Sequence, residues 1–99
     1  MSAFNIVRFR VKPGHEQEFI DLHRKAQRDS AGFQRGSLVS TGDRTFCFIG
    51  EWRSMQDIVE FRPRMAKILD SMREVLEDLG GGLGLTDPVS GESVLEVKN

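Results

Sequence analysis

The segment Phe46–Trp52, with the sequence FCFIGEW, constrains the fold of this 99-residue chain more than any other. It is too short to span a membrane, and it is too apolar for a strand at the protein surface. Its residues alternate between two sides, one formed by Phe46, Phe48, Gly50 and Trp52 and the other by Cys47, Ile49 and Glu51. Because both sides carry large apolar groups, we expect a central strand of a sheet that is covered on each face.

Changes in the spacing of apolar residues predict the elements around this strand. A spacing of two indicates a β-strand, and a spacing near 3.6 indicates an α-helix. The first half of the chain predicts a strand at 3–11, a helix from His15 to about Asp29, and strands at 33–41 and 44–52. Gly36 suggests a bulge in the second strand, and Gly42-Asp43 is typical of a hairpin turn.

The second half of the chain predicts another helix and a last strand. Ser54 and Asp57 have the spacing of a helix N-cap, and apolar residues then recur at helical spacing as far as Leu79. Pro63 predicts a kink or break of this helix near Phe61–Arg62, because proline lacks the amide hydrogen that a helix needs. The glycine-rich segment 80–84 is expected to end the helix, the sequence TDPVSG at 86–91 to form a loop, and the sequence SVLEVK at 93–98 to form the final strand.

The predicted order β-α-β-β-α-β is typical of an α+β, ferredoxin-like fold with a four-stranded antiparallel sheet, in one domain over residues 1–99. In this fold both helices cover one face of the sheet, and the aromatic side of FCFIGEW meets them. The opposite face has no helix to cover it. We therefore expect a homodimer in which a second sheet covers this face, which carries Phe4, Ile6, Cys47 and Ile49.

Composition excludes several kinds of protein. A formal net charge of −1 without a basic stripe argues against a nucleic-acid partner. A single cysteine, Cys47, excludes an internal disulfide and a cysteine-based zinc cluster. Arginines interrupt the apolar pattern of the N-terminal segment, so it does not predict a secretory signal or a membrane contact. A soluble, cytoplasmic protein is expected.

Three segments together resemble the antibiotic-biosynthesis-monooxygenase-like family of dimeric α+β barrels. They are VKPGHEQEF, AGF and FCFIGEWRSMQDIVEF, and the resemblance extends from about Phe4 to Leu79. It implies a dimer and a ligand pocket between the sheet and the helices of each subunit. The family and its structural relatives include quinone-forming monooxygenases that use no cofactor, enzymes that degrade haem, and members without assigned chemistry.

The resemblance implies two alternative functions. The haem-degrading branch is disfavoured, because residues 55–79 contain no histidine and Phe61 occupies the region where that branch has a tryptophan. The first alternative is a monooxygenase without a cofactor that acts on a small electron-rich aromatic or quinol. Enzymes of that branch use asparagine, tryptophan and tyrosine, and this chain has no tyrosine. The second alternative is a non-catalytic dimer that binds a small molecule or regulates.

Two polar residues within apolar patterns are candidates for catalysis. Asn5 interrupts an apolar strand face, where its amide either bonds a neighbouring loop or orients a substrate carbonyl or phenolate. His23 lies on the apolar side of the first helix, where it is either a packing residue or a base that deprotonates a phenol near neutral pH. HEQEF begins like a zinc-protease motif, but Phe19 stands in place of the second histidine, so no metal site is expected.

The remaining candidates would form the walls of the pocket. An apolar cavity with a few convergent polar groups is the usual form of a small-molecule site. Trp52 also has the alternative role of anchoring the junction between the strand and the second helix. We expect aromatic side chains on one wall and residues of the second helix on the other, namely Phe46, Phe48, Trp52, Phe61 and Met65.

Overall fold

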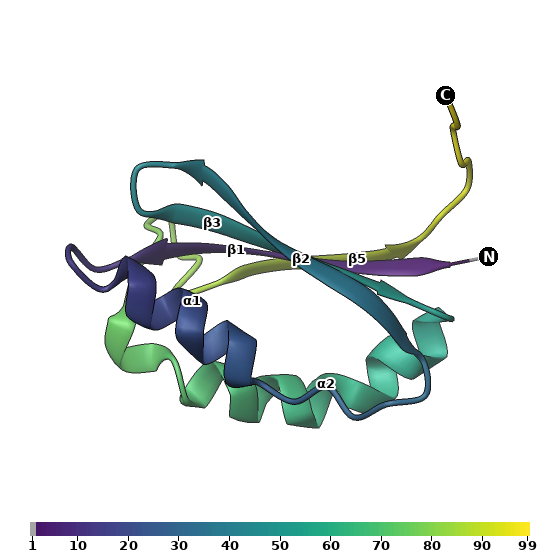
Figure 1. Ribbon diagram of the computed structural model, residues 1–99, viewed down its shortest axis with the longest axis horizontal. Coiled ribbons are helices and arrows are strands. Elements are labelled where there is room, and N and C mark those ends of the chain that lie inside the picture. The colour runs from purple at the N-terminus through teal and green to yellow at the C-terminus, as the bar shows by residue number, and fades with distance from the viewer. Residues whose placement is uncertain (1) are drawn as a thin grey trace.

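The computed structural model describes residues 2–99 and has one layer of sheet packed on one layer of helices (Figure 1). Its elements, in chain order, are β1 (Ala3–Val11), α1 (Glu16–Lys25), β2 (Phe33–Gly42), β3 (Thr45–Trp52), α2 (Met55–Asp70), a 3₁₀ turn (Arg73–Val75), β4 (Leu76–Glu77) and β5 (Asp87–Glu92). Both α1 and α2 lie on the same side of the sheet, and the C-terminal segment extends on the other side.

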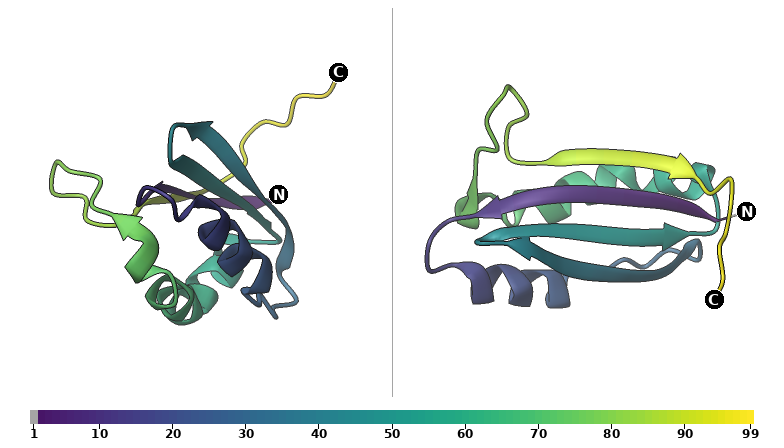
Figure 2. Two further views of the ribbon diagram at one scale, coloured as in Figure 1. Left: turned by 60° about the vertical axis from the view of Figure 1, so that its left-hand side comes forward. Right: turned by 90° about the horizontal axis from the view of Figure 1, so that it is seen from above.

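The sheet is antiparallel, with the order β2-β3-β1 and with both β4 and β5 paired to the far side of β1. Figure 2 shows β5, β1, β3 and β2 side by side when the molecule is seen from above. This arrangement confirms the α+β, ferredoxin-like fold. The expected fourth strand is shared between β4, at one end of β1, and the longer β5.

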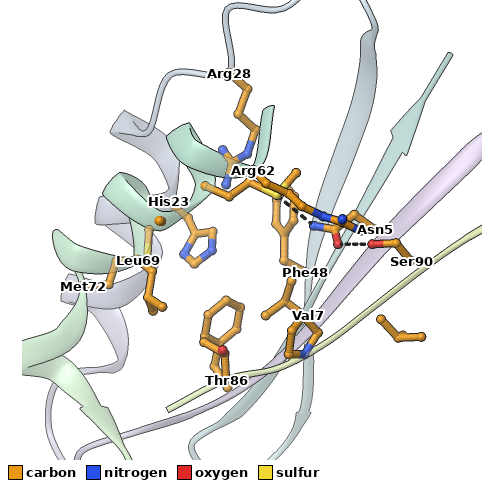
Figure 3. Close-up of a pocket in the computed structure, with 15 residues that line it drawn as sticks. Asn5, Val7, His23, Arg28, Phe48, Arg62, Leu69, Met72, Thr86 and Ser90 are labelled. Atoms are coloured by element: carbon orange, nitrogen blue, oxygen red, sulfur yellow. Dashed lines mark hydrogen bonds between the residues drawn. The ribbon is translucent and has the colours of Figure 1, made fainter. Parts of the chain in front are cut away.

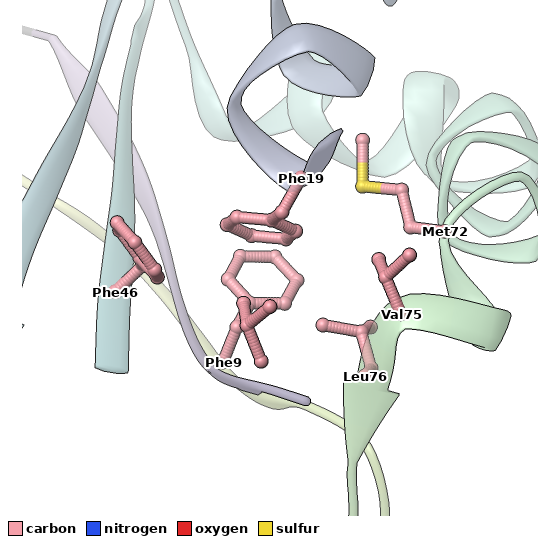
Figure 4. Packing of buried hydrophobic residues seen from close by; sticks show 7 residues of the cluster. Phe9, Phe19, Phe46, Met72, Val75 and Leu76 are labelled. Atoms are coloured by element: carbon pink, nitrogen blue, oxygen red, sulfur yellow. The ribbon is translucent and has the colours of Figure 1, made fainter. Parts of the chain in front are cut away.

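The register of β1 against β3 determines which side chains meet the helices. Phe9 lies opposite Phe46, and Asn5 lies opposite Gly50 and, on the other side, Ser90. Phe9, Val11 and Phe46 are buried beneath the helices. Phe19 of α1 packs on Phe9 and on Phe46, with ring centroids 5.1 and 5.2 Å away (Figure 4). The aromatic side of β3 therefore faces the helices, as expected.

The start of α2 is fixed by a local cap. Ser54 Oγ accepts a hydrogen bond from the Asp57 backbone N–H at 3.2 Å and donates one to the Asp57 carboxylate at 2.8 Å. Arg53 donates two further hydrogen bonds of 3.0 Å to that carboxylate. These bonds satisfy a backbone donor that would otherwise lack a partner, which confirms the predicted N-cap.

Pro63 does not break α2, so the break predicted as one alternative was wrong, and the kink stays a prediction. The helix is continuous from Met55 to Asp70, and Pro63 lies on its exposed face. The helix instead ends earlier than the spacing of apolar residues indicated. Leu76 leaves the helical path and begins β4, where it is buried beside Val11 and Val75 in the main core. The glycine-rich segment consequently follows a strand rather than a helix.

The last strand was assigned to the wrong segment. β5 is Asp87–Glu92 and overlaps the loop predicted at 86–91, whereas residues 93–98 lie outside any strand. Pro88 is tolerated because β5 is an edge strand, where one side of the backbone needs no partner. Val94, Leu95 and Val97 are 90%, 74% and 84% exposed. Pairing with β1 outweighs the greater strand propensity of SVLEVK.

Gly36 is also placed differently from the prediction. It pairs regularly with Gly50, and the register shifts in β2 lie on either side, between Phe33 and Arg35 and between Ser40 and Gly42. A Cβ at position 36 would lie 2.5 Å from Cζ of Phe48, so the glycine makes room for that ring. Within residues 2–99 no helix has the length and apolar character required to cross a membrane.

Candidate functional site

A cavity of about 430 Å³ lies between the sheet and the two helices (Figure 3). A volume of this size is typical of small-molecule sites. β1 and β3 form its floor, β5 its side, and α1 and α2 its roof. Its lining residues are Asn5, Val7, Phe9, His23, Arg28, Phe48, Arg62, Met65, Ala66, Leu69, Met72, Thr86, Pro88, Val89 and Ser90.

The amide of Asn5 is held in a defined orientation in the wall of the cavity. Asn5 is only 8% exposed, and its Oδ1 accepts a hydrogen bond of 2.8 Å from Ser90 Oγ. Its Nδ2 lies 3.7 Å from the sulfur of Met65, which is a weak acceptor. Ser90 thus fixes the oxygen end of the amide, and the nitrogen end keeps hydrogen-bonding capacity for a ligand oxygen.

The imidazole of His23 is packed among aromatic rings. It is 8% exposed, and its centroid lies 4.5 Å from that of Phe19 and 5.4 Å from those of Phe9 and Phe48. Nδ1 lies 3.4 Å from the Phe19 carbonyl oxygen, which can only accept, so Nδ1 carries the proton. Nε2 makes no hydrogen bond within residues 2–99 and retains its lone pair.

His23 is neutral at physiological pH. Burial lowers its pKa to about 4, the Phe19 carbonyl opposes this change, and the positive charge of Arg28 lowers the pKa further. Of the two alternatives for His23, this pKa favours the packing residue over the base that acts near neutral pH. The reason is tertiary, because three aromatic rings remove the water that would solvate an imidazolium ion.

The structure brings some of the candidate residues together and separates others. Asn5, His23, Phe48 and Met65 all line the cavity. Phe46 instead packs in the main core, beside Phe9 and Phe19. Trp52 and Phe61 belong to a second buried cluster, with ring centroids 5.0 Å apart, together with Ala3 and Ile58.

Sequence reasoning missed the residues that β5 and the segment after α1 contribute. Thr86 and Ser90 were assigned to a loop, because the last strand was placed too late in the chain. Arg28 and Arg62 were not among the predicted candidates, yet both line the cavity. A proline-containing strand has no clear pattern, so no signal in the sequence points to this wall.

The described part of the chain, residues 2–99, contains no cluster of three or more histidine, cysteine, aspartate or glutamate side chains that is suited to a metal ion. The polar groups of the cavity are an amide, two hydroxyls, a neutral imidazole and two guanidinium groups. Such groups can hydrogen-bond to an organic ligand and can stabilise negative charge on it.

Residues 2–66 match the family model described as antibiotic biosynthesis monooxygenase. No curated protein matches the chain.

Solved structures with the same fold match almost the whole chain. One is an alanine variant of SnoaB, described as a cofactor-independent oxygenase from Streptomyces nogalater, with 14% identity, a TM-score of 0.77, and coverage of 99% of this chain and 98% of SnoaB. Another is the monooxygenase ActVA-Orf6 of Streptomyces coelicolor in complex with nanaomycin D, with 18% identity, a TM-score of 0.73, and coverage of 99% and 92%. Rv0793 from Mycobacterium tuberculosis is similar at 16% identity, with a TM-score of 0.75 and coverage of 99% and 100%. At these identities the likeness concerns the fold.

Proposed function

This chain belongs to the antibiotic biosynthesis monooxygenase family, and from that premise we propose that it is a cofactor-independent monooxygenase of a small electron-rich phenol or quinol. The observation that carries the proposal is the largely apolar cavity with the oriented amide of Asn5 in its wall. The descriptions of SnoaB as a cofactor-independent oxygenase and of ActVA-Orf6 as a monooxygenase with a bound ligand support it.

The proposed reaction converts a phenol that has a free ring position, together with O₂, into a quinone and water. The phenol loses its hydroxyl proton in bulk solvent before it binds, and the bound anion passes one electron to O₂. The two radicals join in a C–O bond at the ring carbon, and protonation gives a hydroperoxide. Loss of the ring proton then cleaves the O–O bond, which leaves a carbonyl on the ring and releases hydroxide that becomes water. The substrate supplies every electron, so no external reductant is needed.

In this scheme Asn5 stabilises the substrate anion. Its Nδ2 donates a hydrogen bond to the phenolate oxygen, while Ser90 prevents the amide from turning. Removal of one such donor costs roughly 2.7–4 kcal/mol in measured cases, which corresponds to a fall in kcat of about 100-fold or more. The apolar side chains around it, such as Val7 and Leu69, exclude water and strengthen this interaction.

In this scheme His23 does not act as the base. A group whose pKa is about 4 is a poor acceptor for the proton of a phenol, whose pKa is near 10. Its Nε2 lone pair instead accepts a hydrogen bond from a substrate hydroxyl and orients the ring. The positive charge of Arg28 at the cavity favours the anionic form of the substrate.

An oxygen electrode tests the proposal with a panel of naphthols and hydroquinones. We expect O₂ uptake that is stoichiometric with quinone formation, and one heavy oxygen atom in the quinone when heavy-isotope O₂ is used. The Asn5→Ala variant should lose about 100-fold in kcat. The Gln56→Ala variant, which removes an amide at an exposed position of α2 outside the cavity, is the matched control and should keep the wild-type rate. Quinone without heavy oxygen, or equal rates for all three proteins, would reject the proposal.

The lowered pKa of His23 favours a second candidate, a non-catalytic module that binds a small molecule or regulates. Without a ready base in the cavity, the same apolar walls and the Asn5 amide still suffice to hold an aromatic ligand. Calorimetry separates the two functions. Saturable binding of a naphthol without any O₂ uptake would establish the module and exclude the monooxygenase.

We also propose that two copies of the chain associate through the open sheet face. The helices cover only the other face, and Phe4, Ile6, Cys47 and Ile49 on the open face are all partly accessible to solvent. Light scattering should give about twice the chain mass of 11.2 kDa. Ile49→Asp should yield a monomer or an unfolded chain, because it places an unpaired charge in the interface. A wild-type protein that remains monomeric at micromolar concentration would contradict this.

A further inference from the structure

The charged lining of the cavity has one sign only. Its lining includes Arg28 and Arg62 but no aspartate or glutamate. The chain as a whole has 14 basic and 15 acidic residues, so the positive cavity does not reflect the overall charge. In Figure 3 both arginines lie at one end of the cavity, and Thr86 lies at the other.

Arg28 is held at the cavity by contacts that leave its charge without a counter-ion. Its guanidinium lies 4.3 Å from the centroid of the Phe48 ring and donates a hydrogen bond of 3.4 Å to the Ala26 carbonyl. Its partial burial lowers the pKa of its guanidinium, so the charge is kept in an unfavourable environment. No carboxylate within residues 2–99 forms an ion pair with Arg28 or Arg62.

The segment that carries Arg28 is fastened to α2. Arg64 donates a hydrogen bond of 2.8 Å to the carbonyl oxygen of Asp29, the residue next to Arg28, and its guanidinium also lies 4.8 Å from the centroid of the Phe61 ring. This contact joins the segment after α1 to the helix that carries Arg62. The two cationic groups are therefore parts of one local structure at one end of the cavity.

We infer that the ligand of this cavity is an aromatic molecule with a carboxylate, which lies against Arg28 and Arg62 while the ring occupies the apolar interior. Guanidinium groups bind carboxylates through charge-assisted, often bidentate hydrogen bonds. The ring would lie between Val7, Phe48 and Leu69. The choice of an aromatic ligand rests on the proposed function, whereas the requirement for negative charge follows from the lining of the cavity.

Calorimetry with hydroxynaphthoate and its methyl ester tests the inference, because the two compounds have the same ring and differ in charge. We expect the acid to bind at least about tenfold more tightly than the ester, because a hydrogen bond to a charged group is stronger than one to a neutral group. Arg62→Gln should reduce this preference to less than about threefold, and Arg28→Gln should do the same. The preference should also decrease as the salt concentration rises.

Lys67→Gln is the matched control. Lys67 lies on α2, is exposed, and does not line the cavity, and its substitution removes the same single charge. This variant should keep the full preference for the acid. Arg62→Lys restores the positive charge but not the planar guanidinium group, so it should recover part of the preference for the acid. Arg62 is exposed, so its variants remain informative even if Arg28→Gln fails to fold.

The outcomes separate this inference from the proposed function. Tighter binding of the acid that depends on Arg28 and Arg62, without O₂ uptake, would retain the carboxylate inference and reject the monooxygenase. O₂ uptake with equal affinity for acid and ester would retain the monooxygenase and overturn the inference. Equal loss of the preference in Lys67→Gln would also overturn it, because the effect would then reflect net charge alone.

Discussion

Acidification should destabilise this protein through His23 before most carboxylates titrate. The folded state holds the pKa of His23 at about 4, against an ordinary value of 6.5, because burial disfavours the charged ring. As the pH falls below 6.5, the unfolded chain therefore binds a proton that the folded protein does not bind. The stability that His23 contributes is fully present above pH 6.5 and is lost progressively down to about pH 4.

The size of the loss follows from the two pKa values. One pKa unit corresponds to about 1.4 kcal/mol, so the complete loss is about 3 kcal/mol. The same relation places about 2 kcal/mol of that loss between about pH 7 and about pH 5. A domain of this size has a total stability of roughly 5–15 kcal/mol, so the change is readily measured.

Urea unfolding at a series of pH values measures this effect in the wild type and in His23→Phe. The variant keeps an aromatic ring among Phe9, Phe19 and Phe48 but cannot be protonated. Its free energy of unfolding should therefore decline less between about pH 7 and about pH 5, by about 2 kcal/mol. Parallel profiles for the two proteins would refute the reasoning. So would an NMR titration of the His23 ring with a midpoint near 6.5.

Two further predictions concern the start of α2. Ser54→Ala should lower the free energy of unfolding by about 1 kcal/mol, because the Asp57 N–H loses its acceptor, and an unchanged urea midpoint would contradict the role of the cap. Gly32→Ala should cost roughly 1–3 kcal/mol, since its Cβ would lie 2.3 Å from Cγ of Asp57. Gly91→Ala, whose Cβ would meet nothing within 4 Å, is its control in the same melting experiment and should be close to neutral.

Local patterns in the sequence were sufficient for the central strands and for the start of α2. The alternation in 44–52 can be satisfied only by a strand with one side against the helices, so the side of β3 on which Phe46 lies was predicted correctly, although Phe46 packs in the core and does not line the cavity. Ser54 and Asp57 are three positions apart in the sequence, and their hydrogen bond needs no other part of the chain. The family resemblance had the same basis, and the match over residues 2–66 confirms it.

Only the tertiary structure decided how the chain continues after α2. Leu76 fits a helical spacing, but burial beside Val11 draws it into β4. The segment with the greater strand propensity, 93–98, stays unpaired, while Asp87–Glu92 pairs with β1. Propensities differ by about 1 kcal/mol or less between such residues, and pairing along an edge of the sheet easily exceeds that difference.

The candidate site shows the same division between local and long-range information. Asn5 and His23 were recognisable because each is a polar residue in an apolar pattern, and both line the cavity. The sequence did not reveal the lowered pKa of His23, nor the roles of Arg28, Arg62 and Ser90 in the cavity. Each of these properties depends on residues that are distant in the sequence, such as Phe48 beneath Arg28 and Asn5 beside Ser90. A sequence pattern reports which side of an element a residue occupies. The charge and hydrogen bonds of a site depend on which elements meet there, and packing of the whole chain decides that.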